Sequence, residues 1–313
     1  MTEMEIKTPE MTEEVAPEAP RYMPPKRKKR WGDRKDGRRL RTLPPMTRLM
    51  PFIMPHRFDA CNLFTTSFEL TEADRYCHKK NREGLENFNF MHLLLAAYVR
   101  AVSQYPAINR YISGQRVYAR NEITAVMTIK KSMKLESPDT CIKVTFAPDD
   151  TAREIYEKFD AVVRENQADE QSKSDFDGIM DFFTKFPRPL LRGVVRFVKW
   201  LDYHSICVLP DLPFYGSMIM TSMGSLGIPA IYHHIYDFGN LPIFLAFGKK
   251  YFKLDLQPDG TVVKKKNIDL KVVTDERICD GFYYAAAFKY IKKLIEHPEM
   301  LDQRPEQVVE DID

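Results

Sequence analysis

The segment from Thr274 to Phe282 places acidic side chains where a strand-like stretch meets a helix-like one. Its sequence, TDERICDGF, contains Asp275, Glu276 and Asp280. A carboxylate held rigidly at such a junction can act as a general base. It can equally cap the helix by accepting hydrogen bonds from the first amides. A capped turn alone explains Asp280 and its neighbouring glycine, so both interpretations stay open.

Hydroxyl and imidazole side chains form a second group upstream. Thr221 and Ser222 open the sequence TSMGSLG, and His233 and His234 follow in IPAIYHHIYDFGN. A positioned hydroxyl can donate a hydrogen bond to an oxyanion, which typically contributes about 3 kcal/mol to a transition state. A histidine can exchange protons near neutral pH, although a purely structural histidine pair is the alternative.

Both segments resemble motifs of one family, which contains the chloramphenicol acetyltransferases and the catalytic domains of dihydrolipoamide acyltransferases from 2-oxoacid dehydrogenase complexes. Residues 275–281 resemble its Asp-His-Arg-x-x-Asp-Gly motif, and TSMGSLG resembles its Ser-Asn-Leu-Gly-x-x-Gly turn. Residues 242–248, PIFLAFG, resemble its Ala-Ile-Leu-Ala-Val-Gly strand. The motifs follow one another in the expected order, and the resemblance spans residues 48–298.

The resemblance implies coenzyme A as the acyl carrier and a trimer whose active sites lie between subunits, with no metal. In the family, a histidine takes the proton from the thiol of coenzyme A or dihydrolipoamide, and the aligned residue here is Glu276. Thr221, or the adjacent Ser222, aligns with the hydroxyl that stabilises the oxyanion. Asp280 is expected to hold the junction through an arginine such as Arg48 or Arg57. The residues expected to contact substrate are Gly281, His233 and His234.

Glutamate in place of histidine changes the energetics of proton transfer. A thiol titrates near ~8.5, a histidine near ~6.5 and a glutamate near ~4.3. Transfer to an ordinary glutamate is therefore less favourable than transfer to histidine by about 3 kcal/mol. Burial in an apolar channel raises the pKa of a carboxyl group and can offset this difference. Two interpretations follow: Glu276 is a buried base, or it is an ordinary ionised carboxylate that supports no catalysis.

The elements expected around these motifs mix strands and helices. Strands are expected at residues 61–70, 115–133, 141–146, 216–221, 242–249, 251–256 and 262–274. Helices are expected from residue 71 to 105 and at residues 151–166, 177–186, 190–203 and 280–298. This order indicates an α+β fold with a mixed, largely antiparallel sheet. The resemblance adds a two-layer arrangement in which helices pack on that sheet.

The two ends of the chain differ from its middle in composition. Residues 1–41 are expected to form a disordered arm, acidic first and basic from Lys26 onward, and residues 299–313 a loose acidic tail. Residues 42–298 are then the acyltransferase-like domain. The basic run carries about +8 and the rest of the chain about −5. We expect a solvated tether or an arm on a neighbouring subunit, with an acidic partner, an anionic membrane or, least favoured, nucleic acid as alternatives.

Cysteine usage and hydropathy restrict the class of protein. The five cysteines are scattered, without a CxxC pair, so neither a disulfide framework nor a metal site is predicted and a reducing cytoplasm fits best. No apolar run of about 18 residues predicts a membrane span. Residues 190–201, LLRGVVRFVKWL, are basic and apolar at once. They predict either a core helix with outward-reaching Arg and Lys, or a helix that binds a membrane surface or a partner.

These features predict a coenzyme A-dependent acyltransferase that moves an acyl group to or from a thiol, hydroxyl or amine acceptor. The sequence has no lipoyl-domain pattern, so the acceptor is expected to be a separate lipoylated protein or a free small molecule. The alternative is a catalytically inactive trimeric binding or scaffold relative, in which Glu276 has replaced the catalytic histidine.

Overall fold

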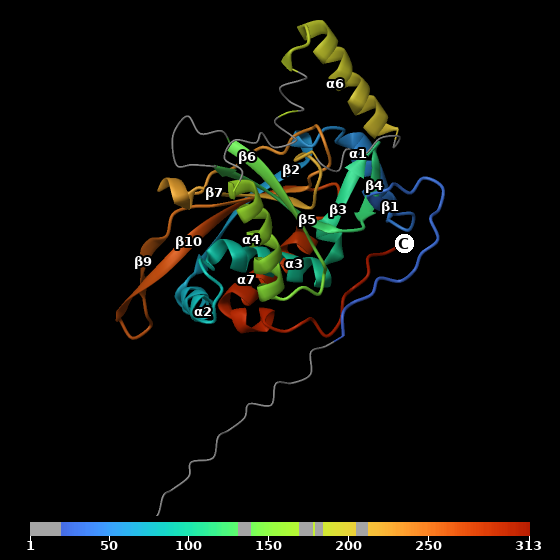
Figure 1. Cartoon of the computed structure of the whole chain (residues 1–313). Helices are drawn as coiled ribbons and strands as arrows, with labels where there is room; N and C mark the ends of the chain where they lie inside the picture. The colour runs from blue at the N-terminus through green and yellow to red at the C-terminus, as the bar shows by residue number, and fades with distance from the viewer. Residues whose placement is uncertain (1–19, 131–138, 169–177, 179–183, 205–211) are drawn as a thin grey trace, which may run out of the picture.

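The computed structural model describes residues 20–130, 139–168, 178, 184–204 and 212–313. Its framework is a seven-stranded sheet in the order β2-β10-β8-β7-β5-β6, with β9 paired to β10 (Figure 1). The strands are β2 (Cys61–Glu69), β5 (Ile123–Lys130), β6 (Asp139–Phe146), β7 (Met218–Ser222), β8 (Ile243–Phe247), β9 (Tyr251–Leu256) and β10 (Val262–Asp275). Strand β7 runs parallel to β5 and β8, and the other pairs are antiparallel. The predicted mixed, largely antiparallel sheet is confirmed.

Helices cover one face of this sheet, which confirms the α+β class. They include α2 (Thr71–Arg82), α3 (Phe90–Gln104), α4 (Ala152–Ala168) and α7 (Gly281–Glu296). One apolar core joins them to the inward-facing residues of β10, β8 and β7. A second, small sheet has the order β1-β4-β3, with β1 (Gly37–Arg39), β4 (Arg116–Arg120) and β3 (Arg110–Ser113). Helix α1 (Pro45–Ile53) lies beside β4.

Helix α3 is buried along almost its whole length, as its apolar composition predicts. It begins with a capping box, in which the Asn89 side chain accepts a hydrogen bond from a first-turn amide and His92 Nδ1 accepts one from the Asn89 N–H at 3.1 Å. The His92 ring stacks on Phe88, with ring centroids 5.3 Å apart. His92 is therefore a core histidine with a structural task.

The basic segment differs from the disordered arm that its charge suggested. Arg34 is buried, donates to Ser113 Oγ at 2.6 Å and forms ion pairs with Asp36 and Asp202. Strand β1 follows it and pairs with β4, so residues 34–41 are part of the domain. Residues 1–19 fall outside the described part of the chain.

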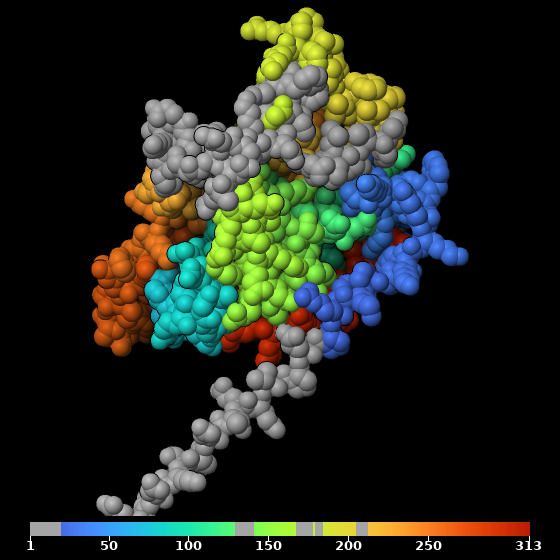
Figure 2. Space-filling model, viewed as in Figure 1, coloured from blue at the N-terminus to red at the C-terminus, as the bar shows by residue number. Residues whose placement is uncertain are grey.

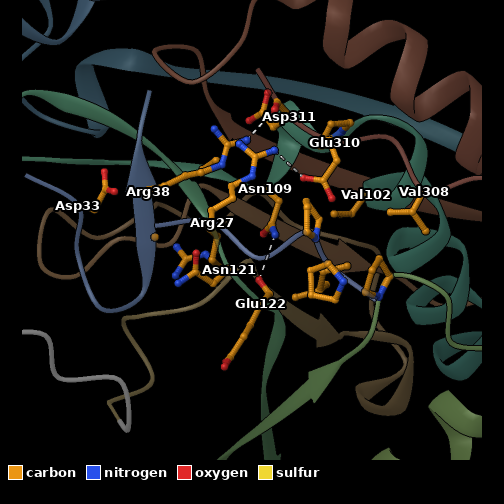
Figure 3. A pocket seen from close by; sticks show the side chains of 18 of the residues that line it. Arg27, Asp33, Arg38, Val102, Asn109, Asn121, Glu122, Val308, Glu310 and Asp311 are labelled. Carbon is orange, nitrogen blue, oxygen red and sulfur yellow. Dashed lines mark hydrogen bonds and ion pairs between the residues drawn. The ribbon is translucent and has the colours of Figure 1, made fainter. Parts of the chain in front are cut away.

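The acidic tail is also packed on the domain rather than loose. Asp311 accepts two hydrogen bonds from Arg110, and Asp313 O accepts from the backbone N–H groups of Arg41 and Thr42. Figure 3 shows Arg27 and Arg38 next to Glu310 and Asp311, around a cavity of about 1050 Å³. The two ends of the chain bind each other because their charges are complementary. The composition of each end, considered alone, does not reveal this contact. None of the predicted site residues lines this cavity.

Helix α6 (Arg188–Tyr203) has no buried residue, so the interpretation as a core helix is wrong. It projects from the body of the molecule in Figures 1 and 2, in yellow. The helix expected at residues 177–186 lies largely outside the described residues. In the part of the chain that the structure describes, no helix is long and apolar enough to cross a bilayer.

Candidate active site

The junction between β10 and α7 is held by a buried ion pair. The Asp275 carboxylate accepts hydrogen bonds from the Arg277 backbone N–H at 3.1 Å, from its Nε at 2.8 Å and from its Nη2 at 2.7 Å. Arg277 Nη1 donates to the carbonyl oxygens of Met54 and Pro55, each at 3.1 Å. Both charged side chains are almost fully buried. The backbone on either side of Glu276 is therefore fixed.

Glu276 lies between the two members of this ion pair and is partly exposed. Its backbone N–H donates to Ala60 O at 2.9 Å. Among the described residues, its carboxylate has no hydrogen-bond or ion-pair partner. The residue aligned with the histidine of the family is thus a free carboxylate on a rigid backbone. One chain does not enclose it, and a second protein surface would be needed to do so.

Asp280 is exposed and caps α7, because its carboxylate accepts the Tyr283 N–H at 2.8 Å. It has no arginine partner among the described residues, so the expected pairing with Arg48 or Arg57 is wrong. The Arg57 guanidinium instead donates to backbone carbonyls and lies 3.9 Å from Asp275. The arginines lie next to the buried Asp275 and not next to the exposed Asp280, because only a buried charge needs an opposite charge to offset the loss of water.

Large apolar side chains lie exposed around this junction. Phe282 is 87% exposed, and Phe58, just before the Ala60 carbonyl that binds Glu276, is 62% exposed. Gly281 begins α7 with open space where a Cβ would lie, so packing within one chain does not require a glycine there. Exposed apolar groups gathered at one place are typical of a surface that another protein or a ligand covers.

The predicted hydroxyl donors end β7 and enter a tight turn. Thr221 and Ser222 are both partly exposed, and the Ser225 hydroxyl donates to Ser222 O at 2.9 Å. A Cβ on Gly224 would lie 2.7 Å from a backbone carbonyl oxygen, and Gly227 has φ +72°, a conformation that favours glycine. Both glycines of the family-like turn therefore have a structural reason.

Thr221 and Glu276 are far apart within one chain. Thr221 lies opposite Ala246 of β8, which lies opposite Lys271 of β10. Glu276 comes five residues after Lys271 in the chain, and β10 lies two strands away from β7 in the sheet. Strand rise and spacing place the two residues roughly 15 to 20 Å apart. The structure does not bring the predicted base and the predicted hydroxyl donor together in one chain.

His233 lies on the same open sheet face as Thr221. Its ring stacks on Phe244, with centroids 4.3 Å apart, and Phe244 pairs with Ile219, two residues before Thr221. Burial, and secondarily the adjacent His234, lowers the pKa of His233. Its Nε2 is buried and has no hydrogen-bond partner among the described residues. His234 is exposed. Of the histidine pair, His233 is the one that stacks on a strand next to β7.

A histidine–carboxylate pair that the sequence did not indicate lies close to the junction. His56 Nδ1 is 2.7 Å from Asp237 Oδ2, and both line a cavity of about 230 Å³ together with Arg277. Burial acts to raise the pKa of Asp237, but the Arg57 N–H and His56 offset it, and the pKa lies below its usual range. The partners are separated by some 180 positions, so no local motif could have shown the pair. Among the described residues, no group of three or more His, Cys, Asp or Glu side chains could hold a metal ion.

Solved structures with the same fold are known, at low sequence identity. A probable dihydrolipoamide acetyltransferase from Listeria monocytogenes matches with TM-score 0.54 and 13% identity, over 80% of this chain and 89% of that one. The dihydrolipoamide acetyltransferase of Azotobacter vinelandii matches with TM-score 0.50 and 13% identity, over 83% and 93%. A chloramphenicol acetyltransferase matches with TM-score 0.47 and 13% identity, over 79% and 94%.

No protein-family model and no curated protein matches the sequence. The solved structures show that the chain has the fold of the dihydrolipoamide acetyltransferase catalytic cores, and the predicted resemblance is confirmed at the level of the fold.

Proposed function

We propose that this protein is a coenzyme A-dependent acyltransferase, with Glu276 as its general base. The observation that carries the proposal is a free carboxylate on the rigid β10–α7 junction of an acetyltransferase fold. A histidine and an asparagine four positions apart were investigated in the catalytic mechanism of the Azotobacter enzyme. Glu276 and Asp280 have the same spacing.

In the proposed reaction, Glu276 takes the proton from the thiol, hydroxyl or amine of the acceptor. The acceptor atom attacks the thioester carbonyl of acyl-coenzyme A, and Thr221 or Ser222 donates a hydrogen bond to the oxyanion. The carbon–sulfur bond then breaks, and the coenzyme A thiolate receives the proton from Glu276. The acceptor is a separate lipoylated protein or a free small molecule.

The proposed assembly is a homotrimer in which Glu276 of one subunit faces Thr221 of the next. The separation of these residues within one chain supports this arrangement, since no single chain contains a complete site. The exposed Phe58 and Phe282 beside Glu276 support a subunit boundary there. A neighbouring subunit would also remove water from the carboxylate, which a glutamate base needs because burial raises a carboxyl pKa toward that of a thiol.

The second candidate function is a catalytically inactive scaffold of the same fold. The partial exposure of Glu276 favours it, because the proposed base would have to be shielded from water.

The Glu276→Gln substitution separates these functions. We expect purified protein to release free thiol from acetyl-coenzyme A with at least one acceptor of a thiol, alcohol and amine panel. Glu276→Gln should lower that rate at least about tenfold, since the base contributes a factor of 10² or more in typical enzymes. Glu276→His is the complementary variant and should keep activity, because histidine is the better matched base. Equal rates for wild type and Glu276→Gln would contradict the role of Glu276, and a large gain with Glu276→His would favour the scaffold.

A further inference from the structure

Helix α6 has two chemically different sides. The spacing of Arg188, Arg192, Arg196 and Lys199 places four cations on one side of the helix, and all four are exposed. The opposite side carries Leu190 and Phe197, which are 50% and 59% exposed, and Trp200, which is 51% exposed, lies at the border of the two sides, four residues after Arg196. A row of partly exposed apolar residues continues that side: Leu191, Val194, Val198 and Leu201. A wide apolar face bordered by cations is typical of helices that lie in the membrane interface.

The contacts of the helix with the described part of the domain lie at its carboxyl-terminal end. Asp202 is the one acidic residue of the helix. Its carboxylate pairs with the buried Arg34 at 2.8 Å, and its backbone carbonyl accepts a hydrogen bond from Ser113 Oγ at 2.9 Å. The Tyr203 hydroxyl donates to Gln115 at 2.8 Å. None of the four cations makes an ion pair with a described residue. The helix is thus anchored to the domain and extends away from it (Figures 1 and 2).

A second apolar surface lies near the anchor. Helix α1 exposes Met46, Leu49, Phe52 and Ile53. Residues Pro55 and His56, which follow α1, line the same cavity as Lys199 and Tyr203 of α6. The exposed apolar residues of both helices therefore belong to one region of the molecule. The combination of aromatic, aliphatic and cationic side chains complements the acyl and headgroup layers of an anionic bilayer.

We propose that α6 binds the surface of an anionic lipid membrane, with Trp200 and Phe197 in the apolar boundary and the four cations at the headgroups. Charge complementarity favours lipid over a protein groove, because a groove that takes the apolar face leaves four cations without partners. An anionic surface satisfies both sides at once, and each basic residue near such a surface contributes about fivefold to the partition coefficient. This inference does not depend on the acyltransferase activity.

Tryptophan fluorescence provides a direct test, since Trp31 and Trp200 are the only tryptophans. In a Trp31→Phe background, Trp200 is the single reporter. We expect its emission to shift to shorter wavelength with phosphatidylcholine vesicles that contain phosphatidylglycerol, and to stay unchanged with phosphatidylcholine alone. Arg192→Glu, Arg196→Glu and Lys199→Glu together should weaken the partition coefficient at least about 100-fold.

A matched variant controls for overall charge. Lys26→Glu, Lys28→Glu and Lys29→Glu together change the net charge by the same amount in the basic segment and should leave binding within about threefold, since these exposed lysines are not part of the α6 surface. Flotation of both variants with the vesicles, and equal thermal melts, complete the comparison. The proposal is overturned by no shift with anionic vesicles, by equal loss in both variants, or by an emission already at short wavelength without lipid. The last result would assign the face to a protein contact.

Discussion

Three carboxylates lie within one short segment at the β10–α7 junction, and each has a different environment. Asp275 is buried against Arg277, Asp280 is exposed at the helix cap, and Glu276 between them has no partner among the described residues. A buried paired carboxylate is costly to disturb, and an exposed cap contributes modestly to stability. Only Glu276 is available to exchange a proton with a bound molecule without weakening the fold.

Substitution of Asp280 distinguishes its role as a cap from a role in catalysis. We expect Asp280→Ala to lower the free energy of unfolding by about 1 kcal/mol, because the Tyr283 N–H loses its acceptor. Asp280→Asn should unfold like wild type, since asparagine caps equally well, and should keep the acyl-transfer rate within about threefold. Urea denaturation followed by circular dichroism measures the first effect. Glu276→Gln serves as a control and should leave stability within about 0.5 kcal/mol. A loss of rate in Asp280→Asn at unchanged stability would instead assign catalysis to the charge of Asp280.

At the scale of elements, local patterns predicted most of the sheet and the buried helices. The strand expected at residues 61–70 is β2, the apolar run that ends before Pro106 is α3, and the Pro-Asp-Gly turn joins β9 to β10. These elements follow from hydrophobic periodicity and turn residues, which act over a few positions. The expected strand at residues 115–133 is two strands in the structure, β4 and β5, because the turn between them contains neither proline nor glycine.

Long-range pairing explains what the sequence did not show. Arg34 meets Asp202 across 168 positions, and Arg110 meets Asp311 across 201. Charge runs considered locally therefore suggested solvated ends, although the charges neutralise each other in the fold. For the same reason, the sequence did not show the His56–Asp237 pair or the approach of Arg57 to Asp275. The candidate site could be located from its motifs, but the ionic contacts around it could not.

The burial of His92 in α3 makes the stability of the fold depend on pH. Burial lowers the pKa of His92 to about 4, whereas an unfolded chain binds that proton near ~6.5. The unfolded state therefore binds more protons below about 6.5, and stability that is fully present above this pH is lost as the pH falls toward about 4. The total loss from this group is about 3 kcal/mol.

Replacement of His92 by glutamine isolates this contribution. His92→Gln keeps a side chain that can accept the Asn89 N–H but does not titrate. Between pH 7 and pH 4, the variant should therefore lose about 2 to 3 kcal/mol less of its free energy of unfolding than wild type loses. Urea denaturation at both pH values measures the difference, and the other titrating groups are common to both proteins. If the free energy of unfolding fell equally with pH in both proteins, His92 would bind its proton equally well in the folded and unfolded states, and the prediction would be wrong.

At the scale of the whole molecule, one chain leaves several apolar surfaces uncovered. The β9–β10 hairpin exposes Phe252, Leu254 and Leu256, and Phe282 lies exposed at the start of α7. These surfaces are distinct from α6, so assembly and membrane binding do not compete for the same side chains. In the proposed trimer, three copies of α6 would strengthen binding to a bilayer through multivalency.

Hybrid trimers test whether two subunits build each site. Glu276→Gln and Thr221→Ala subunits, carrying different affinity tags, are co-expressed and the mixed trimers are isolated through both tags. In a closed ring, a site regains both functional residues wherever an intact Glu276 faces an intact Thr221 from the next subunit. Each mixed trimer, whichever variant is present twice, should then have one restored site in three, well above the activity of either parent. If Glu276 and Thr221 worked together within one subunit, every hybrid would lack one of them at every site and activity would stay at the parental level. Their separation of roughly 15 to 20 Å across the sheet favours restoration, because no side chain in one chain bridges that gap.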